Sequence, residues 1–221
     1  MNFFKTAHRC AAWLPLALTA VCFFSCTPQI SVKATQGDGA SISFKTGFSE
    51  NAAKTLRSIS GLPENGAIFS AQDIILVLTD AGISDAKAST PSVTSLNASG
   101  NVPSVAKSEL FKAMVLSRTK NSLTLTIGPK QIQEIYNRLD DESKSYFDLM
   151  LIPCLIGEKM SVKQYEDLLS SMYGPTFAKE LVTGNLSILL ESPDGKKTNK
   201  VSVTLGELLT LTDAKNWSVS W

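Results

Sequence analysis

The sequence predicts an α+β fold in which hairpins build a mainly antiparallel sheet and helices pack on one face of it. Three observations favour this class. Pairs of segments with alternating apolar and polar residues flank short turn sequences, a block of helical periodicity occupies about residues 130–184, and the chain ends on an alternating segment, 217–221. The sequence contains no internal repeat, so we expect residues 30–221 to form a single domain.

The first part of this domain predicts a hairpin followed by two helices. Apolar and polar residues alternate over 30–35 and 40–46, on either side of the turn sequence 37–39. Helices are expected at 49–60 and 70–82, because each segment begins at a serine that can cap a helix and stops beside a glycine.

Two parts of this region leave the prediction open. The apolar run 74–78 also fits a buried strand, and the flanking capping residues favour the helix. Residues 84–104 are rich in Ser, Ala, Asn and Thr and poor in large apolar side chains. Such a composition buries little surface, so we expect a long mobile loop there, with a weak edge strand at 92–98 as the alternative.

The remaining elements follow from the same periodicities. Pro153 should bend or break the helix in which it lies. In order, the elements expected are strands at 113–117 and 123–127, helices at 130–139, 141–157, 161–172 and 176–182, strands at 185–191 and 199–205, a helical turn at 206–209 and a strand at 217–221.

The first 25 residues have the pattern of a signal peptide. Lys5, His8 and Arg9 precede an apolar run over 11–25, which is shorter than the roughly 20 residues that a spanning helix needs. Cys26 follows this run directly. The predicted organisation is therefore a signal peptide at 1–25, a short tether at 26–29 and the domain.

Phe23-Phe24-Ser25-Cys26 resembles the lipobox of bacterial lipoproteins, in a relaxed form similar to that of spirochaetal lipoproteins. The common box has Leu three residues before the cysteine and a small residue two before it, whereas this chain has Phe23 and Phe24 there. The resemblance implies lipid attachment at Cys26, cleavage after Ser25, and export to a membrane that the protein contacts through its acyl chains.

Two other interpretations of this segment compete. An ordinary signal cleaved within 20–25 would leave a soluble exported protein. An uncleaved anchor is disfavoured by its length and by Pro15, since proline costs about 3 kcal/mol in a helix interior. Cys22 is the weaker acceptor of the two nearby cysteines, because bulky Val21 precedes it.

Composition excludes several classes of function. Removing 1–25 takes away Lys5, Arg9 and the one histidine, and leaves 19 basic and 20 acidic residues, a net charge of −1. A near-neutral chain without basic runs argues against a nucleic-acid partner, and a chain without histidine cannot build a Ser-His-Asp or Cys-His nucleophile. Cys154 is then the one cysteine besides Cys26, and its apolar surroundings indicate a small buried side chain.

The sequence therefore favours a non-enzymatic envelope lipoprotein that needs no cofactor and interacts with another envelope protein or has a structural role. A carrier of lipid or a small hydrophobic ligand is the alternative, with the helical block 144–182 lining a cavity. A second alternative is a hydrolase that uses Asp140, Asp141 or Glu142, although acids at a helix start are expected simply to complement the helix dipole.

The order of elements is also similar to that of uncharacterised spirochaetal lipoproteins, which have an N-terminal hairpin, a helical middle, a late hairpin and a closing Trp strand. The segments that carry this likeness are 30–48, 165–169, 201–211 and 217–221. The resemblance implies a location at the envelope and no particular activity.

Overall fold

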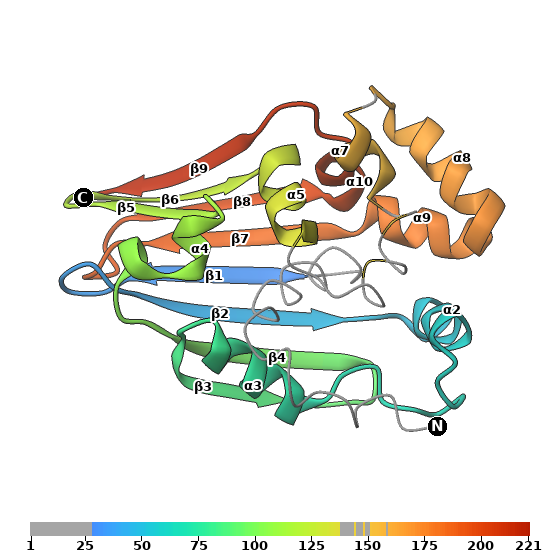
Figure 1. The fold of residues 1–221 in the computed structure, drawn as a ribbon, viewed down its shortest axis with the longest axis horizontal. Coiled ribbons are helices and arrows are strands. Elements are labelled where there is room, and N and C mark those ends of the chain that lie inside the picture. Colours follow the sequence, from blue (N-terminus) through green and yellow to red (C-terminus); the bar gives the residue numbers. More distant parts are fainter. Residues whose placement is uncertain (1–27, 138–143, 145–147, 149–150, 158) are drawn as a thin grey trace.

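The computed structural model describes residues 28–137, 144, 148, 151–157 and 159–221 and confirms the α+β class (Figure 1). A six-stranded sheet with the order β3-β4-β2-β1-β7-β8 forms its larger layer. Its strands are β1 (Gln29–Ala34), β2 (Ala40–Gly47), β3 (Ser84–Ser89), β4 (Ser95–Val102), β7 (Asn185–Glu191) and β8 (Thr198–Thr204).

A second, three-stranded sheet packs over part of the first. It contains β5 (Leu116–Thr119), β6 (Ser122–Ile127) and β9 (Lys215–Ser220) in the order β5-β6-β9. Every pairing in the two sheets is antiparallel except that of β1 with β7. The expected hairpins are thus present, but they are divided between two sheets.

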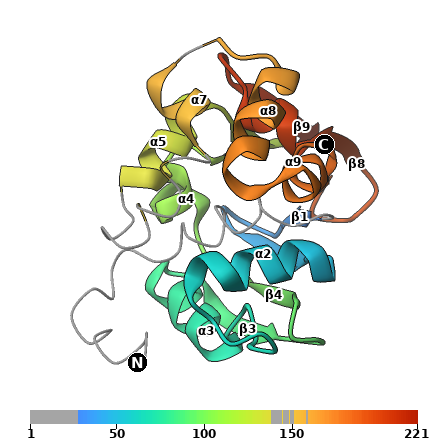
Figure 2. The ribbon, with the colours of Figure 1, turned by 90° about the vertical axis from the view of Figure 1, so that its right-hand side faces the viewer.

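The helices lie between and beside the strands. They are α2 (Glu50–Ser60), α3 (Ala71–Asp80), the 3-10 helix η2 (Val105–Lys107), α4 (Glu109–Lys112), α5 (Pro129–Asn137), α7 (Ile152–Ile156), α8 (Val162–Tyr173), α9 (Pro175–Thr183) and α10 (Leu205–Leu209). In Figure 2, α3, α4 and α5 lie on the same side of the large sheet, while α2 and α9 lie at one end of its strands in Figure 1.

Capping residues fix the helix starts where the sequence predicts them. The Ser49 hydroxyl accepts a hydrogen bond from the Ala52 amide at 3.1 Å, and the Ser70 hydroxyl caps α3 in the same way. Ser161 and Gln164 form a reciprocal capping box at the start of α8. Each cap satisfies amide groups that the first helical turn leaves without partners.

The prediction of a mobile loop at 84–104 is wrong, because β3 and β4 occupy most of it. β4 pairs with β2 over eight residues, from Ser95 to Val102. Its inward positions hold small side chains where the packing is tight: a Cβ added to Gly100 would lie 2.4 Å from Cγ2 of Ile83. Small residues here fit a close approach of β4 to its neighbours, which low hydrophobicity alone does not reveal.

The second hairpin begins later than predicted, and Met114 is the reason. Met114 adopts φ +57°, a left-handed conformation that interrupts an extended strand. The strand β5 therefore starts at Leu116 rather than at residue 113. Most of the helix predicted at 141–157 lies outside the described residues, and Pro153 lies in the first turn of the short helix α7.

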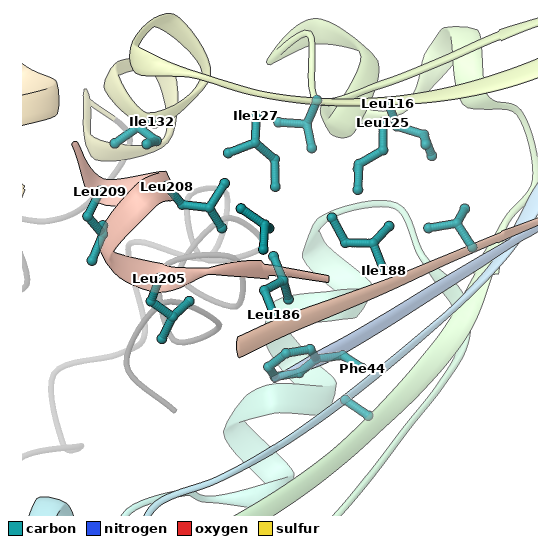
Figure 3. Close-up of a cluster of buried hydrophobic side chains, with 14 of the residues drawn as sticks. Phe44, Leu116, Leu125, Ile127, Ile132, Leu186, Ile188, Leu205, Leu208 and Leu209 are labelled. Carbon is teal, nitrogen blue, oxygen red and sulfur yellow. The ribbon is translucent and has the colours of Figure 1, made fainter. Parts of the chain in front are cut away.

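The hydrophobic core lies between the two sheets (Figure 3). Leu186, Ile188 and Leu190 point inward from β7 and are fully buried, and they face Leu125 and other residues of β6. The short helix α10 closes one end of this layer with Leu205, Leu208 and Leu209, which are buried as well. Burying each such side chain contributes roughly 1.5–3 kcal/mol to stability.

Candidate functional site

The predicted lipidation residue and its neighbour lie outside the described residues. Ser25 and Cys26 both precede Pro28, the first residue that the structure describes. At Pro28 the chain is already fixed, since its carbonyl accepts a hydrogen bond from the Ser187 amide at 2.9 Å. A single residue, Thr27, thus separates Cys26 from the first residue that is bonded to the sheet.

The chain enters the large sheet at its middle. β1, which starts at Gln29, has β2 on one side and β7 on the other, with two more strands beyond one neighbour and one beyond the other. The N-terminal segment therefore leads to the central strands of the domain rather than to a peripheral loop.

The face of the large sheet that points away from the core carries the residues that alternate with the core positions, and we call it the open face. Its middle row crosses all six strands in register and consists of Lys87, Ser99, Ser43, Ser31, Leu189 and Lys200. The rows on either side are Ser89, Asn97, Lys45, Gln29, Ser187 and Ser202, and Ser84, Asn101, Ser41, Lys33, Glu191 and Thr198. All these residues are exposed or half-buried, so no described element covers the open face.

Positive charge prevails on the open face. Two carboxylates lie there: Glu191, the register partner of Lys33, and Asp85, which accepts a hydrogen bond from the Asn101 amide at 3.0 Å. The lysines of the open face are Lys33, Lys45, Lys87 and Lys200. The open face thus has a net charge of about +2, whereas the chain without its first 25 residues carries −1.

A groove of about 580 Å³ lies on the helical side of the molecule, and we call it the α4 groove. It is lined by Ala106, Phe111, Lys112, Met114, Leu116, Ser117, Thr126 and Gln131. Phe111 and Met114 are large apolar side chains that remain about 40 % exposed. Gln131 is buried, and its Oε1 atom has no hydrogen-bond partner among the described residues. Exposed apolar walls beside a few polar groups are typical of binding grooves.

The acidic residues considered for hydrolysis, Asp140, Asp141 and Glu142, lie outside the described residues. Nearby, the Tyr136 hydroxyl donates a hydrogen bond to Asp148. Within the described part of the chain, no cluster of three or more His, Cys, Asp or Glu side chains is arranged to hold a metal ion.

Cys154 is confirmed as a buried side chain. It is 3 % exposed, and its thiol donates a hydrogen bond to the Leu209 carbonyl of α10 at 3.0 Å. Burial in apolar surroundings raises the pKa of this thiol to about 12, because the thiolate would lose its hydration. A thiol with so high a pKa is a poor nucleophile.

The described part of the helical block is packed against the core and does not favour the expected ligand cavity. Tyr165 and Leu169 of α8 are fully buried, and Phe177 of α9 is 3 % exposed. Tyr173 contacts Phe177 edge to face, with 5.6 Å between the ring centroids. The α4 groove lies elsewhere, and its residues come from the segment around the second hairpin.

The open face and the α4 groove are absent from the sequence prediction. A signal for the open face exists in the alternation of Lys and Ser with apolar residues along the strands, as in Ser31-Val32-Lys33. The rows become visible only with the order of strands, which joins β1 to β7 across about 150 residues of sequence. The α4 groove depends on the left-handed Met114, which no sequence pattern marks.

Within the described ranges, no helix is long and apolar enough to span a membrane. Comparisons of the chain with protein-family models, with curated proteins and with solved structures found no match.

Proposed function

We propose that this chain is an exported bacterial lipoprotein, anchored to a membrane by lipid on Cys26, whose domain has a non-enzymatic interaction or structural role in the cell envelope. The observation that carries the proposal is the short join between anchor and fold. Pro28 is hydrogen-bonded to β7, so a lipid on Cys26 would be two residues from the sheet. The basic residues, apolar run and Ser25-Cys26 pair of the first 26 residues supply the signal that such anchoring needs.

Detergent phase partition tests the anchor. The full chain is expressed in a bacterial host, and the wild type is compared with Cys26→Ser and with Cys22→Ser. We expect the wild type and Cys22→Ser to enter the detergent phase and Cys26→Ser to stay in the aqueous phase, because acyl chains contribute about 0.8 kcal/mol for each buried CH₂ group. Aqueous wild-type protein, or loss of partition in Cys22→Ser instead, would refute lipid attachment at Cys26.

The α4 groove is the proposed contact for an envelope protein. Its exposed Phe111 and Met114 offer the aromatic and thioether groups that protein interfaces favour. A photo-reactive amino acid at Phe111, in cells that make the lipidated chain, should cross-link to a partner. The same group at Leu76, an exposed apolar residue of α3, is the matched control. Equal cross-linking from both positions, or none from Phe111, counts against this contact.

A carrier of a small hydrophobic ligand is the second candidate, and the volume of the α4 groove favours it. About 580 Å³ falls within the range of small-molecule sites. Native mass spectrometry of the protein extracted in mild detergent should then show a co-purified ligand that Met114→Glu removes. The hydrolase hypothesis depends on Asp140, Asp141 and Glu142 and gains no support from the described residues.

A further inference from the structure

We propose that the open face is the surface on which the anchored domain lies against anionic phospholipid headgroups. This inference rests on the proposed lipid anchor and adds an orientation to it. The domain would lie with the open face toward the bilayer and the α4 groove directed away from it, where a partner could reach the groove.

The short tether limits how far the domain can stand from the membrane. From Cys26 to Gln29 the chain spans three residues, which reach at most about 10 Å when fully extended. Gln29 is itself part of the open face, in the row that also holds Lys45. A lipid on Cys26 would therefore place this row next to the headgroups.

Of the surfaces near the anchor, the open face is the one with a suitable charge. The inner face of the sheet is occupied by the core and by the second sheet. The end of the strands beside Gln29 carries the carboxylates of Glu50 and Glu180, the latter accepting a hydrogen bond from the Ser49 hydroxyl. A negative membrane surface repels carboxylates and attracts lysines, and attraction falls off within about a Debye length.

The side chains between the lysines suit contact with a flat layer. Ser31, Ser43 and Ser99 form the centre of the middle row, and the register places lysines at both of its ends. Short hydroxyl side chains leave the longer lysines projecting beyond them. Lysine ammonium groups and serine hydroxyls both donate hydrogen bonds, which headgroup phosphates accept.

Lysine acetylation on vesicles tests the orientation. The full lipidated chain, with its lipid verified by intact mass, is reconstituted in phosphatidylcholine vesicles with or without phosphatidylglycerol. A water-soluble acetylating reagent is then added, and modification is read at each lysine. We expect Lys33, Lys45, Lys87 and Lys200 to react more slowly when phosphatidylglycerol is present, and this protection to disappear at high salt. Lys107 and Lys120, which are exposed outside the open face, should react equally in both vesicles.

A charge variant supplies the second measurement. Substitution of the open-face lysines by glutamine should restore rapid hydrogen exchange of the sheet face on phosphatidylglycerol vesicles. Each removed lysine lowers the docked population on the order of fivefold. Substitution of Lys54, Lys107, Lys120 and Lys130 by glutamine is the matched control with the same change in net charge.

The outcomes separate the two proposals. A chain without lipid by intact mass would overturn the proposed function and the orientation with it. A lipidated chain whose open-face lysines react equally on both vesicles would overturn the orientation and leave the anchor standing. Protection that appears only after envelope proteins are added would also overturn it, and would assign the open face to a protein partner.

Discussion

The two faces of the large sheet differ completely although they are made by the same six strands. On β7, Leu186, Ile188 and Leu190 are fully buried, while Ser187 and Glu191 point to the other side and remain partly exposed. The inner face is held by apolar packing, which specifies the fold. The outer face contributes little to packing, so its residues are free to serve binding, and its excess of lysine is most simply related to an anionic partner.

The largest expected effect comes from truncating the inner face. Leu186→Ala should lower the free energy of unfolding by about 2–5 kcal/mol, because it removes a buried side chain and leaves a cavity. Ser187→Ala, one residue away on the open face, should change it by less than about 0.5 kcal/mol. Urea denaturation of both variants checks the contrast, and similar losses would show that the open face is packed against something.

Glycines on the two faces provide a second contrast. Gly100→Ala should destabilise by about 1–3 kcal/mol, because the new Cβ would lie 2.4 Å from Ile83 Cγ2 and 3.0 Å from the Ser84 carbonyl oxygen. At Gly47, on the open face, the nearest atom would be 3.6 Å away. Gly47→Ala should therefore be close to neutral in thermal denaturation. A neutral Gly100→Ala would contradict the tight packing of β3 on β4.

Cys154 makes the dryness of the core measurable as a pH dependence. Its folded pKa of about 12 exceeds the ordinary value of 9.0, so the neutral thiol contributes stability that is complete below pH 9. This contribution falls by about 1.4 kcal/mol per pH unit as pH rises from 9 to 12, because the unfolded chain releases the proton first.

Cys154→Ala is the appropriate comparison. The difference in unfolding free energy between wild type and variant should be constant up to about pH 9 and shrink above it. The other titrating groups are common to both chains and cancel. A difference that stays constant up to pH 11 would mean that water reaches the thiol in the folded state.

The smallest expected effect concerns the open-face lysines. Lys87→Gln and Lys200→Gln should alter the unfolding free energy by less than about 0.5 kcal/mol, since both side chains are exposed. A chemical denaturation curve that coincides with that of the wild type would separate these residues from folding. A loss above 1 kcal/mol would assign them a structural role instead.

Local signals account for the elements that sequence reasoning located correctly. The hairpins β1–β2 and β7–β8 surround Gly37 and Gly195, both at positive φ, and α8 begins at the predicted capping box of Ser161 and Gln164. Such features are decided within a few residues of sequence. The same holds for Cys154, whose burial follows from its apolar neighbours.

Features that depend on distant partners escaped prediction. β3 and β4 form from a Ser- and Ala-rich segment because β2 supplies backbone partners along the whole length of β4. The parallel pairing of β1 with β7 and the division into two sheets are likewise decided by tertiary packing. The open face could be predicted residue by residue from alternation, but its rows require this strand order. The proposed anchor residue Cys26 depends on the sequence alone.

The most direct test of the proposed anchor is the intact mass of the protein purified from bacterial membranes, with Cys26→Ser beside the wild type. We predict a wild-type mass equal to that of residues 26–221 plus the diacylglyceryl group and any further acyl chain, and loss of the lipid mass in Cys26→Ser. A wild-type chain that carries no lipid would contradict the anchor and, with it, the orientation of the open face toward a membrane.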